Sequence, residues 1–247
     1  MNCPQLEWQL PRVFAHRCGG ALAPENTLAG LAVAANLGFR AVEFDVMLSA
    51  NGSPWLIHDD LLERTTNGKG KVCDTSDAVL GELDAGGFQH KAFAGERLPR
   101  FEATVHRLHE LGLMANVEIK PAIGHETETG EVVTRTLLKL WQGRPWPLVS
   151  SFSEEALVAA RKLAPELPLG FLWERPPVDW LARMDAIGAF SLHIAAWEVT
   201  DEILATAKAR KIPVLCWTVN DRPEADALFK RGVTSIFSDR IDLFDAM

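Results

Sequence analysis

The stretch AVEFDVML (Ala41–Leu48) decides how this sequence is expected to fold. Apolar residues dominate it, as in a buried strand, yet it also carries Glu43 and Asp45. Successive side chains of a strand point to opposite faces, so residues two positions apart share a face. The stretch therefore predicts a buried strand with two carboxylates on one side, which is costly unless those groups serve a site.

Three other short apolar runs end in ionisable side chains in the same way. They are VFAHR (13–17), WLIHD (55–59) and ANVEIK (115–120). Each begins with residues that favour strands and places its titratable groups at or near its C-terminal end. The residues of these runs that we select as site candidates are His16, Arg17, His58, Glu118 and Lys120.

Strand-like runs and helical patterns alternate along the chain. Residues 26–37 are typical of a helix, rich in Ala and Leu, with Asn26 or Thr27 as the N-cap. An Asn-Gly pair at 51–52 predicts a tight turn into a hairpin arm at 54–58. Strands are expected at 13–17, 41–48, 114–120, 147–152, 169–173, 192–197, 212–219 and 235–239, and further helices at 100–111, 125–141, 154–163, 178–187, 200–210 and 223–231.

This alternation predicts a parallel sheet with right-handed crossovers. Eight strand units in 247 residues suit a closed (β/α)8 TIM barrel, whose active-site groups lie at the C-terminal ends of the strands. We therefore expect one barrel domain over residues 1–247. Residues 60–99, rich in Gly, Asp, Lys and Thr, replace the helix after the second strand. They are expected to form an insertion on the catalytic face.

Composition narrows the class of protein. The formal net charge is −8 and the pI about 5.4, and no basic run offers a footprint for nucleic acid. No apolar stretch approaches the length that inserts into a membrane, and the N-terminus has no leader-like pattern, so we expect a cytoplasmic protein. The scattered cysteines are expected to be reduced thiols. Oligomeric state leaves no signal in the sequence. The cysteines are Cys3, Cys18, Cys73 and Cys216.

The three carboxylates Glu43, Asp45 and Glu118 predict a metal site. They offer oxygen ligands only, which suit a hard divalent cation better than zinc, with Mg²⁺ favoured and Ca²⁺ possible. Without a cation, three crowded carboxylates would repel one another and raise one another's pKa.

Two histidines and two cations complete the candidate site. His16 and His58 can serve as an acid/base pair, because imidazole titrates near neutral pH. Arg17 and Lys120 supply positive charge for an anionic ester. Trp217 either walls the pocket against a small polyol or is an ordinary buried barrel tryptophan. The other histidines, which we expect to be structural or solvent-facing, are His90, His106, His109, His125 and His193.

The combined motifs closely resemble the glycerophosphodiester phosphodiesterase family. The resemblance runs from about residue 12 to Asp239 and is strongest to the cytosolic bacterial members associated with glycerol-3-phosphate uptake. One position departs from the family pattern, because Cys18 stands where a Gly usually follows the His-Arg pair. The matching motifs are AHR (15–17), APENT (23–27), EFD (43–45), HDD (58–60), LERT (62–65), EIK (118–120) and WTVN (217–220).

The resemblance implies a TIM barrel, one divalent cation, and hydrolysis of glycerophosphodiesters to sn-glycerol 3-phosphate and an alcohol. Suitable substrates would be glycerophosphocholine or glycerophosphoethanolamine. It also implies that His16 and His58 act as acid and base. By the same resemblance, Glu43, Asp45 and Glu118 would be metal ligands, and Arg17 and Lys120 phosphate contacts.

Two other functions remain open at this stage. One is a related barrel phosphodiesterase that acts on phosphoinositides or sphingolipids by cyclic-phosphate transfer, although residues 60–99 carry no aromatic-rich stripe for lipid. The other is a non-catalytic barrel that binds phosphate esters, which would not need an acid/base couple such as His16 and His58.

Overall fold

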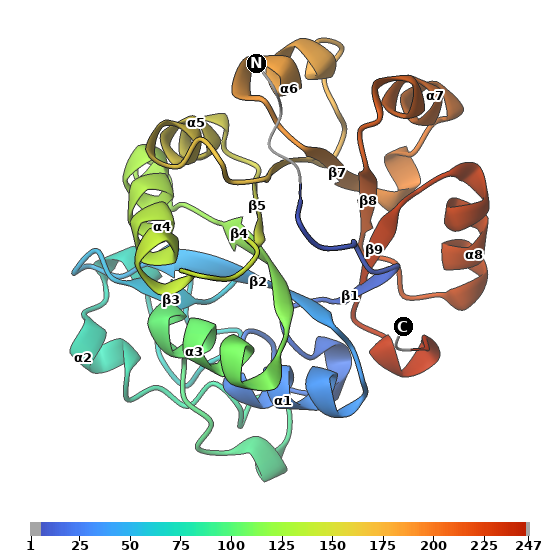
Figure 1. Cartoon of the computed structure of the whole chain (residues 1–247). Helices are drawn as coiled ribbons and strands as arrows, with labels where there is room; N and C mark the ends of the chain where they lie inside the picture. The colour runs from blue at the N-terminus through green and yellow to red at the C-terminus, as the bar shows by residue number, and fades with distance from the viewer. Residues whose placement is uncertain (1–5, 246–247) are drawn as a thin grey trace.

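The computed structural model describes residues 6–245 and contains a closed barrel of eight parallel strands (Figure 1). The sheet closes because β1 pairs with both β2 and β9. A ninth strand, β3 (Pro54–Leu56), runs antiparallel to β2 as the predicted hairpin arm. The TIM-barrel prediction is confirmed. The barrel strands are β1 (Val13–Ala15), β2 (Ala41–Leu48), β4 (Met114–Ile119), β5 (Leu148–Ser151), β6 (Leu169–Trp173), β7 (Ser191–Ala195), β8 (Val214–Trp217) and β9 (Ser235–Ser238).

Seven helices follow strands and surround the barrel (Figure 1). Local chemistry sets their starts: the Thr27 hydroxyl accepts the Gly30 N–H, so the first helix begins at Leu28. The seven are α1 (Leu28–Asn36), α3 (Phe101–Leu111), α4 (Glu126–Leu140), α5 (Glu154–Leu163), α6 (Trp180–Ile187), α7 (Asp201–Arg210) and α8 (Arg222–Arg231).

Apolar side chains fill the barrel as well as its surroundings. The main core lies between sheet and helices, whereas a separate cluster of strand residues occupies the interior. The barrel is therefore packed beneath its mouth and is no open pore. The strand members of the inner cluster are Phe14, Ala41, Leu148, Leu215 and Phe237.

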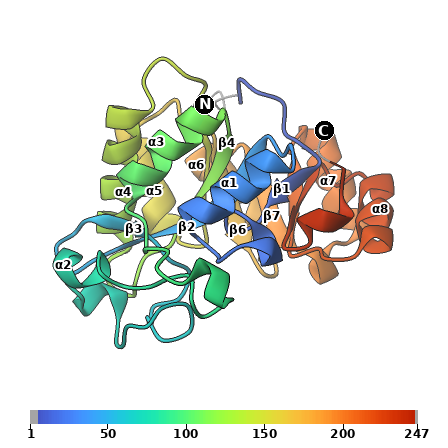
Figure 2. The same ribbon diagram turned by 90° about the horizontal axis from the view of Figure 1, so that it is seen from below.

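Residues 60–99 form mainly turns, with one short helix, α2 (Asp77–Leu80), and two 3₁₀ turns. They pack on the hairpin arm through an apolar cluster of their own, which includes Trp55, Leu62 and Leu80. Figure 2 shows this segment at the end of the barrel opposite the two chain termini. The segment is an insertion between the hairpin arm and α3, the helix that leads into β4, so the expectation that it replaces that helix is wrong.

Two smaller features complete the fold. Within residues 6–245, no helix combines the length and the apolar character that a membrane crossing requires. Cys18, Cys73 and Cys216 are free thiols, and Cys3 lies outside the described residues.

Candidate active site

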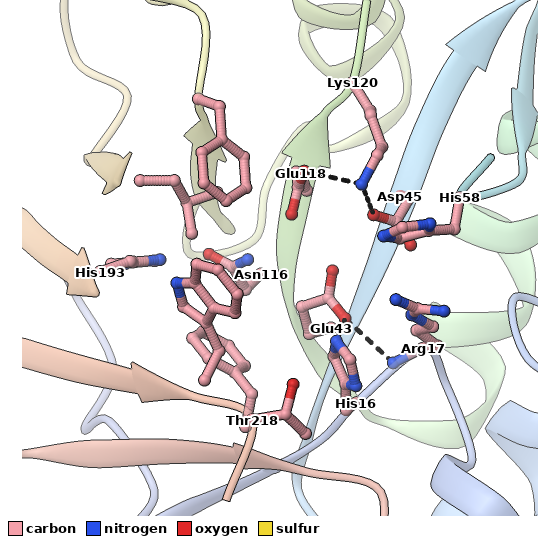
Figure 3. A pocket seen from close by; sticks show the side chains of 14 residues that line it. His16, Arg17, Glu43, Asp45, His58, Asn116, Glu118, Lys120, His193 and Thr218 are labelled. Atoms are coloured by element: carbon pink, nitrogen blue, oxygen red, sulfur yellow. Dashed lines mark hydrogen bonds and ion pairs between the residues drawn. The ribbon is translucent and has the colours of Figure 1, made fainter. Parts of the chain in front are cut away.

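One cavity of about 250 Å³ contains every site residue expected from the sequence (Figure 3). It opens at the C-terminal ends of the barrel strands, as the fold requires. The expected residues that line it are His16, Arg17, Glu43, Asp45, His58, Glu118, Lys120 and Trp217. The lining also includes Asn116, Phe152, Leu172, His193, Thr218 and Phe237.

The three predicted metal ligands converge within this cavity. Glu43 and Asp45 share a face of β2, and Glu118 lies opposite Asp45 in the register of β2 and β4. One oxygen atom from each lies within 4.8 Å of the others, and all three residues are buried. Glu43 Oε1 has no hydrogen-bond partner in the described chain, and Glu118 Oε1 has only the Lys120 ammonium at 3.5 Å. This set of oxygen donors fits a hard divalent cation.

The electrostatics of the triad also favour a bound cation. Burial, and then repulsion from Asp45 and Glu118, raises the pKa of Glu43 well above its ordinary value. Burial and Asp45 raise the pKa of Glu118 to about 7. Burial opposes ionisation of Asp45 too, but Lys120, His58 and Arg17 outweigh it and lower its pKa to about 2. A cation would relieve the repulsion that two of these three groups experience.

The loop after β1 holds two of these carboxylates in place. The strand ends at Ala15, and Arg17 has a φ of 49°, so the chain leaves extended geometry there. The Arg17 backbone N–H then donates to Glu43 Oε2 at 2.9 Å. Asn26 Nδ2 donates to Asp45 Oδ2 at 2.9 Å, and the Asp45 N–H donates back to Asn26 Oδ1. The Asn of the APENT motif is therefore a support for the site, although we predicted it only as a possible helix cap.

Each candidate catalytic histidine is paired with a carboxylate through Nδ1. His16 Nδ1 lies 2.6 Å from Asp239 Oδ1, and Asn220 Nδ2 donates to the other oxygen of Asp239. His58 Nδ1 lies 2.6 Å from Asp59 Oδ1. A carboxylate in this position fixes the ring and its tautomer, so that Nε2 is the nitrogen left for chemistry. His16 Nε2 lies 3.7 Å from Glu43 Oε2, beside the triad.

Burial, with Lys120 and Arg17, lowers the pKa of His58 despite opposing attraction from Asp45 and Asp59. A lowered pKa keeps this imidazole neutral at neutral pH, which is the form that accepts a proton.

The two cations are held by different partners. The Lys120 ammonium lies 3.4 Å from Asp45 Oδ1, within the triad. Arg17 Nη1 donates to Glu25 Oε1, and Arg64 joins Glu25 to Asp59. Arg17 Nε is buried and has no hydrogen-bond partner among residues 6–245. An unused guanidinium N–H at the edge of an acidic triad is suited to a phosphate oxygen.

The Cys18 side chain lies outside the cavity. Its side chain is fully buried, and Gly30 of α1 makes room for it, because a Cβ at residue 30 would lie 2.9 Å from the Cys18 Cβ. The described residues that line the cavity do not include Cys18.

Sequence reasoning missed several members of the site. His193, which we expected to be structural or solvent-facing, is fully buried inside the barrel and lines the cavity. Asp239 was predicted only as the end of the last strand, although the same strand-end rule that selected Glu118 could have indicated it. The other residues without an assigned role that contact the site are Glu25, Asp59, Arg64, Asn116 and Asn220.

The fold and the cavity together define a class of protein, a (β/α)8-barrel enzyme whose acidic, histidine-lined mouth suits phosphodiester chemistry. A sequence profile of the Glycerophosphoryl diester phosphodiesterase family matches residues 16–243. The chain belongs to this family and is a phosphoric diester hydrolase.

Individual relatives agree with this assignment. A glycerophosphodiester phosphodiesterase from Caldanaerobacter subterraneus is 31% identical over 227 residues, with 92% of this chain and 93% of that protein covered. An Oleispira antarctica phosphodiesterase, solved in complex with the product sn-glycerol-3-phosphate, superimposes with a TM-score of 0.91 at 37% identity and 94% coverage of both chains. A glycerophosphodiester phosphodiesterase from Agrobacterium tumefaciens gives a TM-score of 0.78 at 26% identity, covering 96% of this chain and all of that one.

Proposed function

We propose that this enzyme hydrolyses glycerophosphodiesters, such as glycerophosphocholine or glycerophosphoethanolamine, to sn-glycerol 3-phosphate and an alcohol. One observation carries the proposal. His16 and His58, each backed by a carboxylate 2.6 Å from Nδ1, line the same cavity as a buried acidic triad. The product named for the Oleispira relative supports the glycerol-phosphate half of the substrate.

In this proposal the two histidines divide the proton transfers. One Nε2 takes a proton from the attacking water molecule, whose oxygen forms the new bond to phosphorus. The other gives a proton to the oxygen of the leaving alcohol as its bond to phosphorus breaks. Asp239 and Asp59 keep the rings oriented and stabilise the protonated imidazole when it forms.

The remaining polar groups would hold the phosphate. The unused Nε–H of Arg17 and the ammonium of Lys120 offer donors to its non-bridging oxygens. Glu43, Asp45 and Glu118 would hold one divalent cation, with Mg²⁺ favoured and Ca²⁺ possible because every ligand is an oxygen. When bound, the cation would supply Lewis-acid polarisation of the phosphate.

The test is direct. The protein is incubated with glycerophosphocholine, with and without EDTA, and glycerol 3-phosphate is measured by coupled NADH formation. We expect NADH only in the metal-replete sample, and expect Glu43→Gln to abolish it. Glu102→Gln, an exposed acid on α3, is the matched control and should leave the rate unchanged. No glycerol 3-phosphate from the wild-type protein with Mg²⁺ or Ca²⁺ would overturn the proposal.

Three broader expectations also stand as proposals. We propose that residues 1–247 form a single catalytic domain, that residues 60–99 are an insertion within it, and that the protein acts in the cytoplasm on small-molecule substrates.

A further inference from the structure

Three polar side chains in the cavity have no part in the proposed chemistry. They are Asn116, His193 and Trp217. Asn116 is 1% exposed and His193 is 0% exposed. Figure 3 shows these two side chains directed toward each other at the end of the cavity away from Lys120 and His58. Within the described residues, Asn116 Oδ1, His193 Nδ1 and Trp217 Nε1 are all buried and have no hydrogen-bond partner.

Each of the three side chains is fixed from its other side. Asn116 Nδ2 donates to Ser150 Oγ at 2.9 Å, and His193 Nε2 lies 2.9 Å from Ser191 Oγ. Gly170 on the neighbouring strand β6 leaves space for the imidazole, because a Cβ there would lie 2.5 Å from His193 Nε2.

The Trp217 ring is packed edge-on against Phe152 and Trp197, with ring centroids 5.5 and 6.0 Å away. The unused polar atoms are therefore held in place before any ligand arrives, and each carries the cost of a buried group without a partner.

The chemistry of these atoms selects the ligand. The free oxygen of Asn116 only accepts, and the indole N–H of Trp217 only donates. Burial lowers the pKa of His193 to about 3, so its ring is neutral and Nδ1 can donate or accept. A hydroxyl group can satisfy both kinds of atom, whereas a carboxylate cannot donate and an ammonium group cannot accept.

Apolar side chains lie beside these three residues. Phe152 contacts the Trp217 ring. Phe237 contacts the His193 ring, and Leu172 lies opposite His193 in the register of β6 and β7. All three also line the cavity, and they would contact the carbon atoms of a short polyol.

We propose that Asn116, His193 and Trp217 form a subsite that binds the terminal hydroxyl group of the glycerol half of the substrate. This inference rests on the proposed glycerophosphodiester hydrolysis and makes the three residues determinants of its specificity.

The experiment compares two diesters that differ by one hydroxyl group. One is glycerophosphocholine, and the other is 2-hydroxypropyl phosphocholine, which keeps the hydroxyl group next to the phosphate ester and lacks the terminal one. A site built to hydrogen-bond a hydroxyl group rejects the analogue that lacks it by as much as about 10⁴-fold. We expect the wild-type kcat/KM to fall at least roughly 100-fold on the analogue.

His193→Leu tests the subsite because leucine has a comparable volume and no nitrogen atoms in its side chain. This variant should lower kcat/KM for glycerophosphocholine by roughly 30- to 100-fold. It should change kcat/KM for the analogue by less than about 3-fold. His193→Asn, which restores a polar atom near the position of Nδ1, should recover part of the loss. The matched control is His125→Leu. His125 is the N-cap of α4 and lies 3.0 Å from a carboxylate oxygen of Glu128 at the surface, so this variant should leave kcat/KM for both diesters unchanged.

Equal losses on both diesters in His193→Leu, or no loss on either, would overturn the inference and leave the cluster as internal barrel packing that holds at most a water molecule. If that variant does not fold, Trp217→Phe is judged by the same criterion. Absence of any wild-type hydrolysis of glycerophosphocholine would instead overturn the proposed function, so the two failures are distinguishable.

Discussion

The two halves of the barrel mouth are built from different chemistry. The half formed by β1 to β4 carries almost all of the ionisable groups, including both candidate catalytic histidines and the acidic triad. The half formed by β5 to β9 presents apolar and neutral polar side chains, such as Phe152, His193 and Trp217. We propose from this contrast that reaction and recognition are largely separated around one ring of strands, with Asn116 of β4 and Asp239 after β9 as the exceptions. Substitutions in the charged half should slow the hydrolysis of every diester. Substitutions in the neutral half should alter the relative kcat/KM values among diesters.

The largest expected effect is in the charged half, on metal removal. Chelation should lower kcat by at least roughly 10³-fold on any diester, because metal-ion polarisation is worth several kcal/mol. Mg²⁺ or Ca²⁺ should restore the rate, and Zn²⁺ should do so poorly. Initial rates after dialysis against EDTA measure this. Full activity after exhaustive chelation contradicts the assignment of Glu43, Asp45 and Glu118.

The histidines come next. His16→Ala and His58→Ala should each lower kcat by about 10²–10⁴-fold, with a much smaller change in substrate affinity. If the pair works as a unit, the double variant should be hardly slower than the slower single variant.

The histidine that acts as the acid can be identified by comparing two substrates whose leaving groups differ in their need for a proton. Loss of the acid should cost much less with a p-nitrophenyl phosphodiester than with glycerophosphocholine, because p-nitrophenolate leaves without a proton. Loss of the base should slow both substrates alike. Equal losses of both variants on both substrates would mean that neither histidine protonates the leaving group.

Smaller losses of activity are expected when the carboxylates that pair with the two histidines are changed. Asp239→Asn and Asp59→Asn keep the shape of the pairs but remove their charge, and outer partners of this kind typically contribute about 10–100-fold. Both variants should lower kcat more than they raise KM and should shift the pH–rate profile. An unchanged profile in both would show that the carboxylates only fill space.

The smallest expected effect is a pH-dependent stabilisation by metal. Because the pKa of Glu118 is raised to about 7 and that of Glu43 is also raised, the metal-free folded protein holds protons that the unfolded chain releases. Its stability should therefore fall as pH rises from the unfolded values of these groups through about 7. Metal binds the deprotonated form, so at one fixed concentration of Mg²⁺ or Ca²⁺ the gain in Tm should be larger near pH 8 than near pH 6.

Calorimetry with Glu43→Gln as the control measures this gain. Saturation at roughly 100 times Kd corresponds to ~2.7 kcal/mol, or roughly 5–10 °C in a chain of this size. A gain in Tm that shrinks toward pH 8 would count against the proposed ligands.

The same contrast explains what the sequence could predict. In the charged half, ionisable groups stand at the ends of short apolar runs or alternate along β2. The sequence pattern therefore predicted both the strand on which each group lies and the face to which it points. Contacts between distant parts of the chain were harder to predict. Asp239 lies 223 positions from His16, and only the fold brings the two side chains together.

His193 gave no signal, since it lies within a fully buried strand. Its direction toward the interior is shown by its contact with Phe237 and by Leu192 and Ile194, which pack in the main core.

Element bounds show a similar limit. Most helices and strands lie within two residues of the expected bounds, because caps and apolar periodicity fix them locally. The strand expected at 192–197 was too long at its C-terminal end: it stops at Ala195, and Ala196–Glu198 form a 3₁₀ turn with Trp197 65% exposed. An apolar run alone does not reveal where a strand gives way to the rim of the barrel.

The division of the mouth is tested most directly by one set of kcat/KM values. Glu43→Gln from the charged half and Trp217→Phe from the neutral half are each assayed on glycerophosphocholine and on bis(p-nitrophenyl) phosphate, which has no hydroxyl group. We predict that Glu43→Gln loses at least roughly 10³-fold on both, whereas Trp217→Phe loses roughly 10-fold or more on glycerophosphocholine alone. Parallel losses of Trp217→Phe on both substrates, or survival of either activity in Glu43→Gln, would contradict the account.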